Sequence, residues 1–114
     1  MFIGFYGTRD LDATHAFYTA GLGLELSRDQ GACRIYAVPG GGMVGFCLHL
    51  PVAVEGRSPI LTFVTDDVDG RYDALLDAGY SAETAPATNE RFRIYHFFAR
   101  DPNGYLVEVQ RFLD

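Results

Sequence analysis

The pattern of hydrophobic and polar positions divides the first half of the chain into one helix and four strands. Residues 2–7 are aromatic and β-prone, and Asp10 after them can cap a helix. Apolar side chains then recur at helical spacing to about Ala20, and Gly21 predicts the helix end. Three short strands are predicted next, at residues 24–28, 33–38 and 44–50. This half is therefore predicted to be a βαβββ unit.

The second half repeats the same order of elements. A strand at residues 59–65 precedes Asp67, which can cap a helix that ends at Gly79. Three strands are predicted after it, at residues 81–86, 92–100 and 105–112, of which the first has the weakest pattern. The polar stretch at residues 85–91 predicts either a solvated connection or a mobile loop that could cover a site.

The two halves also match each other in sequence. Residues 3–12 and 60–69 share Ile, Thr, Asp and Asp at a constant spacing, and further matches follow with only slight drift. Such a pattern indicates a duplicated unit. We therefore expect one domain, with unit 1 at about residues 1–50, a linker at about residues 51–59 and unit 2 at about residues 60–114. In a duplicated fold, function is expected between the units.

Composition limits the classes of partner. The 114 residues are 48% hydrophobic and 14% aromatic, which suits one globular domain, and the formal net charge is −6. This charge disfavours nucleic acid and anionic membrane as partners and favours cationic ligands. No apolar run reaches the roughly 20 residues that span a bilayer, and the start of the chain lacks the basic region of a signal peptide. We expect a cytoplasmic protein.

The two cysteines form no recognised motif. Cys33 and Cys47 are neither a C-x-x-C pair nor numerous enough for a disulfide framework. Isolated cysteines of this kind commonly act as small buried apolar side chains. We therefore predict two free thiols rather than a disulfide or a metal site.

Several motifs together resemble one superfamily. They are Asp10-Leu11-Asp12, Phe17-Tyr18, Leu22-Gly23 and, above all, Asp101-Pro102-Asn103-Gly104-Tyr105-Leu106-Val107-Glu108. With the duplicated βαβββ unit, they resemble the vicinal oxygen chelate superfamily, which includes glyoxalase I, extradiol dioxygenases, and fosfomycin- and bleomycin-resistance proteins. The resemblance covers essentially the whole chain. It implies an α+β fold in which curved mixed β-sheets surround a central cavity, with one helix per unit on the outer face.

The resemblance also locates the positions at which metalloenzymes of the superfamily bind an ion. A histidine is usual in the opening strand of each unit, where this chain has Ile3 and Ile60, and the closing-strand positions fall on His49 and Glu108. Isoleucine has no lone pair, and two protein ligands rarely hold a divalent ion. We therefore expect no cofactor. The loss of both opening-strand donors resembles the bleomycin-resistance branch, which sequesters its ligand without a metal.

Two arrangements remain open for the polar side chains of the predicted cavity. Strand alternation, with the turn geometry that the resemblance implies, puts His96 on the same face as Glu108. His49, His96 and Glu108 would then form a ligand set for a divalent metal such as zinc or iron. In the simpler arrangement, which we favour, His96 and Glu108 form a hydrogen-bonded pair without an ion.

Our first functional hypothesis is a metal-free protein that binds and sequesters an aromatic or cationic small molecule. The alternative is a metal-dependent lyase, isomerase or dioxygenase that uses His49, His96 and Glu108, and a third hypothesis is an interaction module. Spacing alone identifies no catalytic residue. We predict ligand contacts from Ile3, Phe5, Cys47, His49, Ile60, Thr62, His96, Phe98, Leu106 and Glu108. Small folds of this kind usually pair, so we expect a homodimer.

Overall fold

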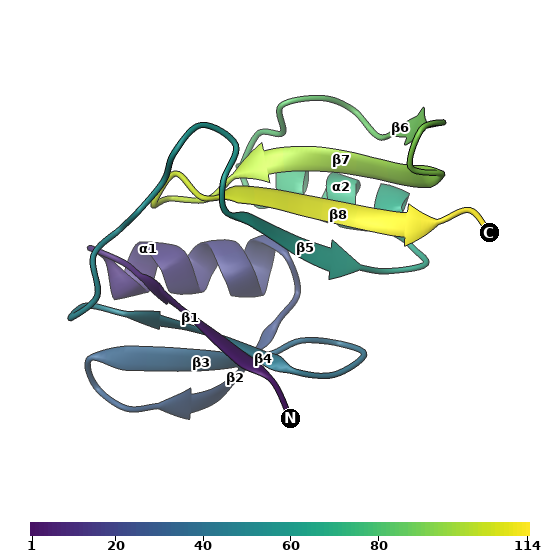
Figure 1. Cartoon of the computed structure of the whole chain (residues 1–114). Helices are drawn as coiled ribbons and strands as arrows, with labels where there is room; N and C mark the ends of the chain where they lie inside the picture. The colour runs from purple at the N-terminus through teal and green to yellow at the C-terminus, as the bar shows by residue number, and fades with distance from the viewer.

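The two halves of the chain form two four-stranded sheets, and the computed structural model describes all 114 residues (Figure 1). Unit 1 contains β1 (Ile3–Gly7), α1 (Leu11–Ala16), a π-helical turn η1 (Phe17–Gly21), β2 (Glu25–Asp29), β3 (Cys33–Ala37) and β4 (Met43–Cys47). Unit 2 contains β5 (Ile60–Val64), α2 (Val68–Asp77), β6 (Ala87–Asn89), β7 (Ile94–Arg100) and β8 (Leu106–Phe112). The predicted βαβββ order is confirmed in both units.

Both sheets have the same topology. The strand orders are β1-β4-β3-β2 and β5-β8-β7-β6. The first and last strands of each unit pair in parallel, and the other neighbours are antiparallel. Helix α1 contacts β4, while α2 contacts β7 and β8, so each sheet has one face against its own helix (Figure 1). The α+β fold class is confirmed. Neither helix is long and apolar enough to cross a membrane.

Each helix begins at the aspartate that was predicted to cap it. Asp10 Oδ1 accepts a hydrogen bond from the amide of Ala13 at 2.9 Å. Asp67 Oδ1 accepts one from the amide of Gly70, also at 2.9 Å. These bonds satisfy amides that have no partner within the helix.

The first helix differs from the predicted helix to Ala20. The α-helical hydrogen bonding ends at Ala16, and the chain continues as the wider turn η1. Phe17 and Tyr18, which are adjacent in sequence, are both fully buried in the core from this turn. The core cluster also holds Leu75 and Phe97 of unit 2, so the two units share one interior.

The turn between β7 and β8 attaches unit 2 to unit 1. Asp101 Oδ1 accepts hydrogen bonds from the amides of Asn103 at 2.8 Å and Tyr105 at 2.9 Å. Asp101 Oδ2 accepts one from the hydroxyl of Tyr18 at 2.7 Å, and the Tyr105 hydroxyl donates to the carbonyl of Gly7 at 2.8 Å. Burial raises the pKa of both Tyr18 and Asp101. The Asp-Pro-Asn-Gly-Tyr motif therefore has a structural role here.

The predicted strand at residues 81–86 is wrong. The strand in this part of the chain is β6, which lies within the stretch that was predicted to be a loop. It pairs with β7 through Ala87 opposite His96 and Asn89 opposite Ile94. An edge strand is half solvated and tolerates polar residues, so its composition resembles that of a loop.

The prediction of two free thiols is also wrong, because Cys33 and Cys47 form a disulfide. The two residues lie directly opposite each other on β3 and β4, with a Cα–Cα distance of 4.1 Å. The two cysteines are well separated in the sequence, so no local motif predicts the disulfide. The register of the β3–β4 hairpin brings them together.

Candidate functional site

Strand alternation decides which side chains lie on the face of each sheet that is turned away from its helix. In unit 2, Leu61, Phe97 and Val107 lie in the core, so the alternate positions lie on the opposite face. This second open face carries Ile60, Thr62, Val64, Ile94, His96, Phe98, Leu106, Glu108, Gln110 and Phe112. The first open face, in unit 1, carries Ile3, Phe5, Cys33, Ile35, Ala37, Met43, Gly45 and Cys47.

Polar side chains from three neighbouring strands meet on the second open face. The hydroxyl of Thr62 on β5 donates a hydrogen bond to Glu108 Oε1 on β8 at 2.9 Å. Glu108 Oε2 lies 2.6 Å from Nδ1 of His96 on β7. The side chains of His96 and Glu108 are only 14% and 11% exposed, so these bonds replace the water that both groups have lost. The favoured His96–Glu108 pair is thus present in the structure.

Gln110 adds a further donor to this polar set. With its amide nitrogen turned toward Glu108, it donates to the two carboxylate oxygens at 3.2 Å and 3.3 Å. Glu108 then has donors from three side chains, which hold the carboxylate in one orientation. Gln110 was not among the predicted site residues, although its alternation with Glu108 on one strand is a signal that identifies it.

A hollow of about 440 Å³ lies over the polar set. It is lined by Ile60, Asn89, Phe92, Ile94, His96, Phe98, Glu108, Gln110 and Phe112. Phe92 and Phe112 are 61% and 55% exposed, so the hollow has a polar floor and an apolar wall open to solvent. All lining residues belong to unit 2, so within one chain a single unit forms this hollow.

The linker lies at one end of the second open face. The guanidinium carbon of Arg57 is 4.8 Å from the centre of the Phe98 ring, within the range of a cation–π contact. Arg57 also pairs with Glu83 at 3.2 Å, and Glu83 pairs with Arg100 at 3.5 Å. These contacts hold the linker against the sheet beside the hollow.

The first open face is filled by its own side chains. The Phe5 ring lies over Gly45, where an added Cβ would come within 2.6 Å of the ring. Ile35 beside Gly45 is buried, as are Cys33 and Cys47. A ring, an aliphatic chain and a disulfide therefore occupy the surface that carries the polar set in unit 2.

The strand registers show which positions of the two units correspond. Phe5 lies opposite Gly45 in unit 1 as Thr62 lies opposite Glu108 in unit 2. Gly45 is therefore the counterpart of Glu108, and the prediction that His49 occupies that strand position is wrong. His49 lies in the exposed turn after β4. The registers place Gly45 and Glu108 63 residues apart, whereas His49 lies 59 residues before Glu108, so the sequence match was four residues out of register here.

The predicted ligand contacts divide between the two faces. Ile60, Thr62, His96, Phe98, Leu106 and Glu108 share the second open face, whereas Ile3, Phe5 and Cys47 share the first. His49 belongs to neither, and its Nδ1 lies 3.7 Å from Sγ of Cys33. Sequence reasoning missed Phe92, Phe112 and Asn89 as lining residues. Phe112 could have been identified, because it alternates with Glu108 on the same strand. The position of Phe92 depends on the path of a loop, which the sequence does not indicate.

The residues at the positions that the superfamily resemblance indicated do not fit a metal site. Ile3 and Ile60 provide only hydrocarbon, and His49 contacts Cys33 in unit 1. His96 and Glu108 are left as donors, and they bond each other. A divalent ion held by protein normally needs at least three such ligands.

Two smaller hollows lie where the units meet. Their volumes are about 210 Å³ and 330 Å³, and their linings are mainly apolar side chains and backbone. The larger has Arg71 as its charged residue. Neither contains a buried polar set like that of the second open face.

The family model described as Glyoxalase/Bleomycin resistance protein/Dioxygenase superfamily matches residues 5–109. No curated protein sequence matches the chain. Solved structures share the fold. TioX from Micromonospora sp. ML1 is 19% identical with a TM-score of 0.81, covering 98% of each chain. A family protein from Burkholderia phytofirmans PsJN is 23% identical with a TM-score of 0.80, covering 97% of each chain. One from Nocardioides is 21% identical with a TM-score of 0.78, covering 99% of this chain and 83% of that one.

Proposed function

Because the chain belongs to the glyoxalase/bleomycin resistance protein/dioxygenase superfamily, we propose that it is a metal-free small-molecule-binding protein whose site is the hollow over the second open face. The observation that carries this proposal is the hydrogen-bonded set of Thr62, His96 and Glu108 beneath exposed phenylalanine rings. Sites for small molecules combine an apolar wall with a few oriented polar groups in this way.

The proposed ligand is planar, aromatic and cationic. Phe92 and Phe112 expose large apolar surfaces that stacking on a flat ring would remove from water. Glu108 supplies an oriented carboxylate at the floor, and the chain as a whole is acidic with a formal net charge of −6. The volume of about 440 Å³ lies within the range of about 300–1,000 Å³ that is usual for such sites.

The alternative activity is that of a metal-dependent lyase, isomerase or dioxygenase. One observation favours it: Nδ1 of His96 bonds Glu108, and Nε2 of the same ring has no hydrogen-bond partner in the chain. Histidines that bind metals are often oriented in this way by a carboxylate. The additional ligands that such an ion needs are lacking around this pair, which is why we favour capture without a metal.

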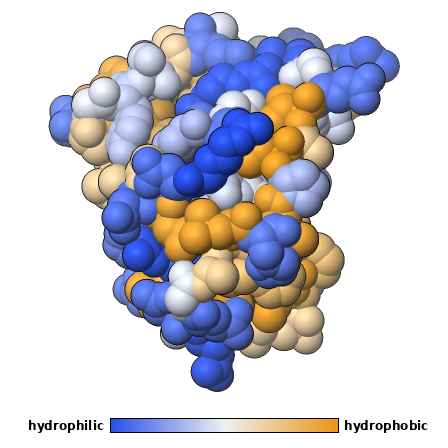
Figure 2. Space-filling view, turned by 90° about the vertical axis from the view of Figure 1, so that its left-hand side faces the viewer, coloured by the Kyte–Doolittle hydropathy of each residue, from blue (hydrophilic) through white to orange (hydrophobic).

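Exposed apolar side chains are relevant to the predicted homodimer. Ile3, Phe5, Ile60 and Val64 are exposed apolar residues on or beside the open faces. Figure 2, which views the molecule from the left-hand side of Figure 1, shows hydrophobic residues gathered between hydrophilic ones. Such surface supports a proposal of pairing with a second copy. The cytoplasmic location stays a prediction.

Thermal unfolding in the presence of ligand tests the proposed function. Purified chain is titrated with planar aromatic cations, with neutral compounds of the same shape and with aliphatic cations. We expect the unfolding midpoint to rise most with the aromatic cations, because a ligand that binds only the folded state stabilises it. Equal midpoints across the whole panel would reject the proposal. Stoichiometric metal retained after reconstitution, and lost in His96→Gln, would support the enzyme instead.

A further inference from the structure

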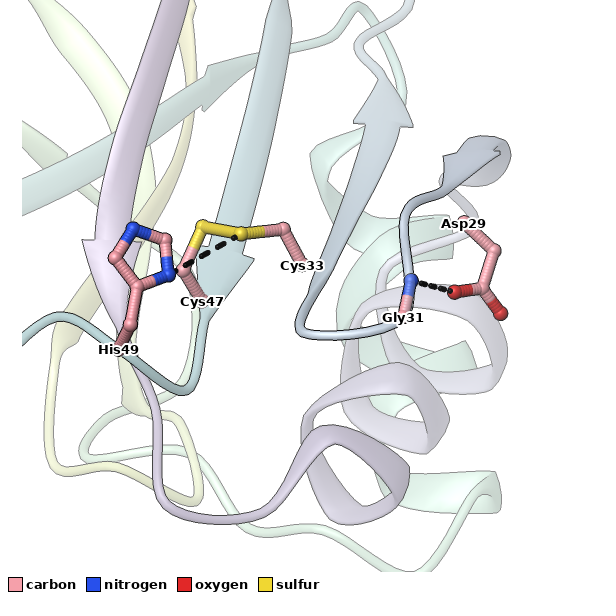
Figure 3. The surroundings of a disulfide bond; sticks show 5 residues. All are labelled: Asp29, Gly31, Cys33, Cys47 and His49. Atoms are coloured by element: carbon pink, nitrogen blue, oxygen red, sulfur yellow. Dashed lines mark hydrogen bonds between the residues drawn. A yellow bond between two sulfur atoms is a disulfide. The ribbon is translucent and has the colours of Figure 1, made fainter.

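A second cluster of chemically active side chains lies in unit 1. Sγ of Cys33, Sγ of Cys47 and a ring nitrogen of His49 all lie within 4.8 Å of one another (Figure 3). The cysteines are buried and His49 is exposed, so the cluster is reached from solvent on the side of the imidazole. We propose that this cluster is a redox-gated zinc site, which is closed while the disulfide is intact and forms when the disulfide is reduced.

The chemistry of the three donors supports a thiophilic ion. Two thiolates and one imidazole are ligands that zinc prefers, and water can complete four-coordination. Zn–S bonds of about 2.3 Å and Zn–N bonds of about 2.0 Å at tetrahedral angles put sulfur and nitrogen about 3.5 Å apart. Nδ1 of His49 already lies 3.7 Å from Sγ of Cys33.

The backbone keeps the ligands together without the S–S bond. Cys33 and Cys47 end a ladder of β3–β4 pairs that continues to Ala37 opposite Met43. The carbonyl of Cys47 accepts a hydrogen bond from the amide of Thr8 at 3.0 Å, and that of Cys33 accepts one from the amide of Gln30 at 2.8 Å. Reduction breaks none of these bonds, so the two sulfurs stay neighbours.

Electrons and protons balance in the conversion between the disulfide state and the zinc-bound state. A dithiol reductant transfers two electrons and two protons to the disulfide and becomes a disulfide itself. Zn²⁺ then binds both sulfurs as thiolates, and their two protons pass to solvent. A small-molecule disulfide reverses the sequence: it accepts the two electrons, takes up two protons from solvent to become a dithiol, and the ion is released. The oxidised sulfurs have no thiolate charge, which is why the closed state does not hold zinc.

The test measures Zn²⁺ binding by the full-length chain in both redox states. One sample is reduced with dithiothreitol and desalted without oxygen, and a second is left oxidised. Each is titrated with Zn²⁺ against a chromophoric chelator. We expect the reduced chain to bind one equivalent, with an affinity at least about 100-fold above that of the oxidised chain. Equal binding in the two states overturns the proposal.

Variants identify the ligands. His49→Ala removes an exposed side chain and is expected to weaken Zn²⁺ binding by the reduced chain at least about tenfold. His96→Gln is the matched control, because it alters the second open face, and it should leave this binding unchanged. Loss of binding in His96→Gln together with normal binding in His49→Ala overturns the proposal. Co²⁺ provides a spectroscopic check, since the reduced chain should show a thiolate-to-metal absorption band that the Cys33→Ser/Cys47→Ser variant lacks. The outcome is independent of ligand binding by the hollow in unit 2.

Discussion

The two open faces have the same strand topology and register, but they carry side chains of different size and polarity. Where unit 2 has Thr62 opposite Glu108, unit 1 has Phe5 opposite Gly45. The carboxylate of unit 2 keeps its hydrogen bonds beneath an open hollow, whereas the glycine of unit 1 lies beneath an aromatic ring. A duplicated unit can thus keep one face open and use the other for packing and a cross-link.

The same comparison shows how the two units differ although their sequence pattern repeats. The backbone registers of β1–β4 and β5–β8 are alike, but the side chains on them differ in size and polarity. Filling the first open face stabilises the fold, because a void there would lose packing contacts. Phe92 and Phe112, which line the hollow in unit 2, are 61% and 55% exposed, and a stability requirement alone does not explain such exposure.

Reduction of the disulfide should have the largest effect on stability. Cys33 and Cys47 are 14 residues apart in sequence, and closing a loop of this size stabilises a fold by about 3 kcal/mol. Urea unfolding with and without reductant, in a metal chelator, measures the difference. The Cys33→Ser/Cys47→Ser variant should not respond to reductant. Ligand affinity of unit 2 should stay the same, and a parallel loss there would show that the two faces are coupled.

Gly45→Ala should lower the free energy of unfolding, because it crowds the first open face. The new Cβ would lie within 2.6 Å of the Phe5 ring, and overpacking of this kind costs about 1–3 kcal/mol. Chemical denaturation measures this loss of unfolding free energy. Gly4→Ala is the matched control, since its Cβ would meet no atom nearer than 3.4 Å. Adding Phe5→Ala to Gly45→Ala should remove the clash, and a double variant no more stable than Gly45→Ala would contradict this packing.

Glu108→Gln should weaken ligand binding about tenfold, equivalent to about 1.4 kcal/mol, because it removes the charge that orients a cationic group. Isothermal titration with the best aromatic cation of the panel measures this effect. Glu90→Gln changes an exposed carboxylate near the hollow and serves as the control. Similar losses in both variants would indicate general attraction by the acidic surface rather than a specific contact.

Phe112→Ala should have the smallest effect, about threefold on affinity, with little change in stability because the side chain is largely exposed. The same titration measures it, and Phe2→Ala, an exposed phenylalanine that does not line this hollow, is the comparison. An unchanged affinity would limit the ligand contacts to the polar floor.

Much of the architecture could be predicted from local patterns. The caps at Asp10 and Asp67 and the order of strands depend on residues close in sequence, and they are confirmed. The His96–Glu108 pair followed from alternation on two neighbouring strands. Strand β6 was missed because an edge strand shares its polar composition with loops.

By itself, the sequence determined the duplicated βαβββ order and the α+β class, because capping, periodicity and turn residues act over a few positions, and its motifs identified the superfamily by resemblance. Only the tertiary structure decided that Gly45 corresponds to Glu108, that Cys33 meets Cys47, and that the hollow lies over unit 2 alone. These outcomes depend on strand register and on which side chain fills which space. A shift of a few residues in pairing leaves the sequence pattern unchanged but alters every contact between strands.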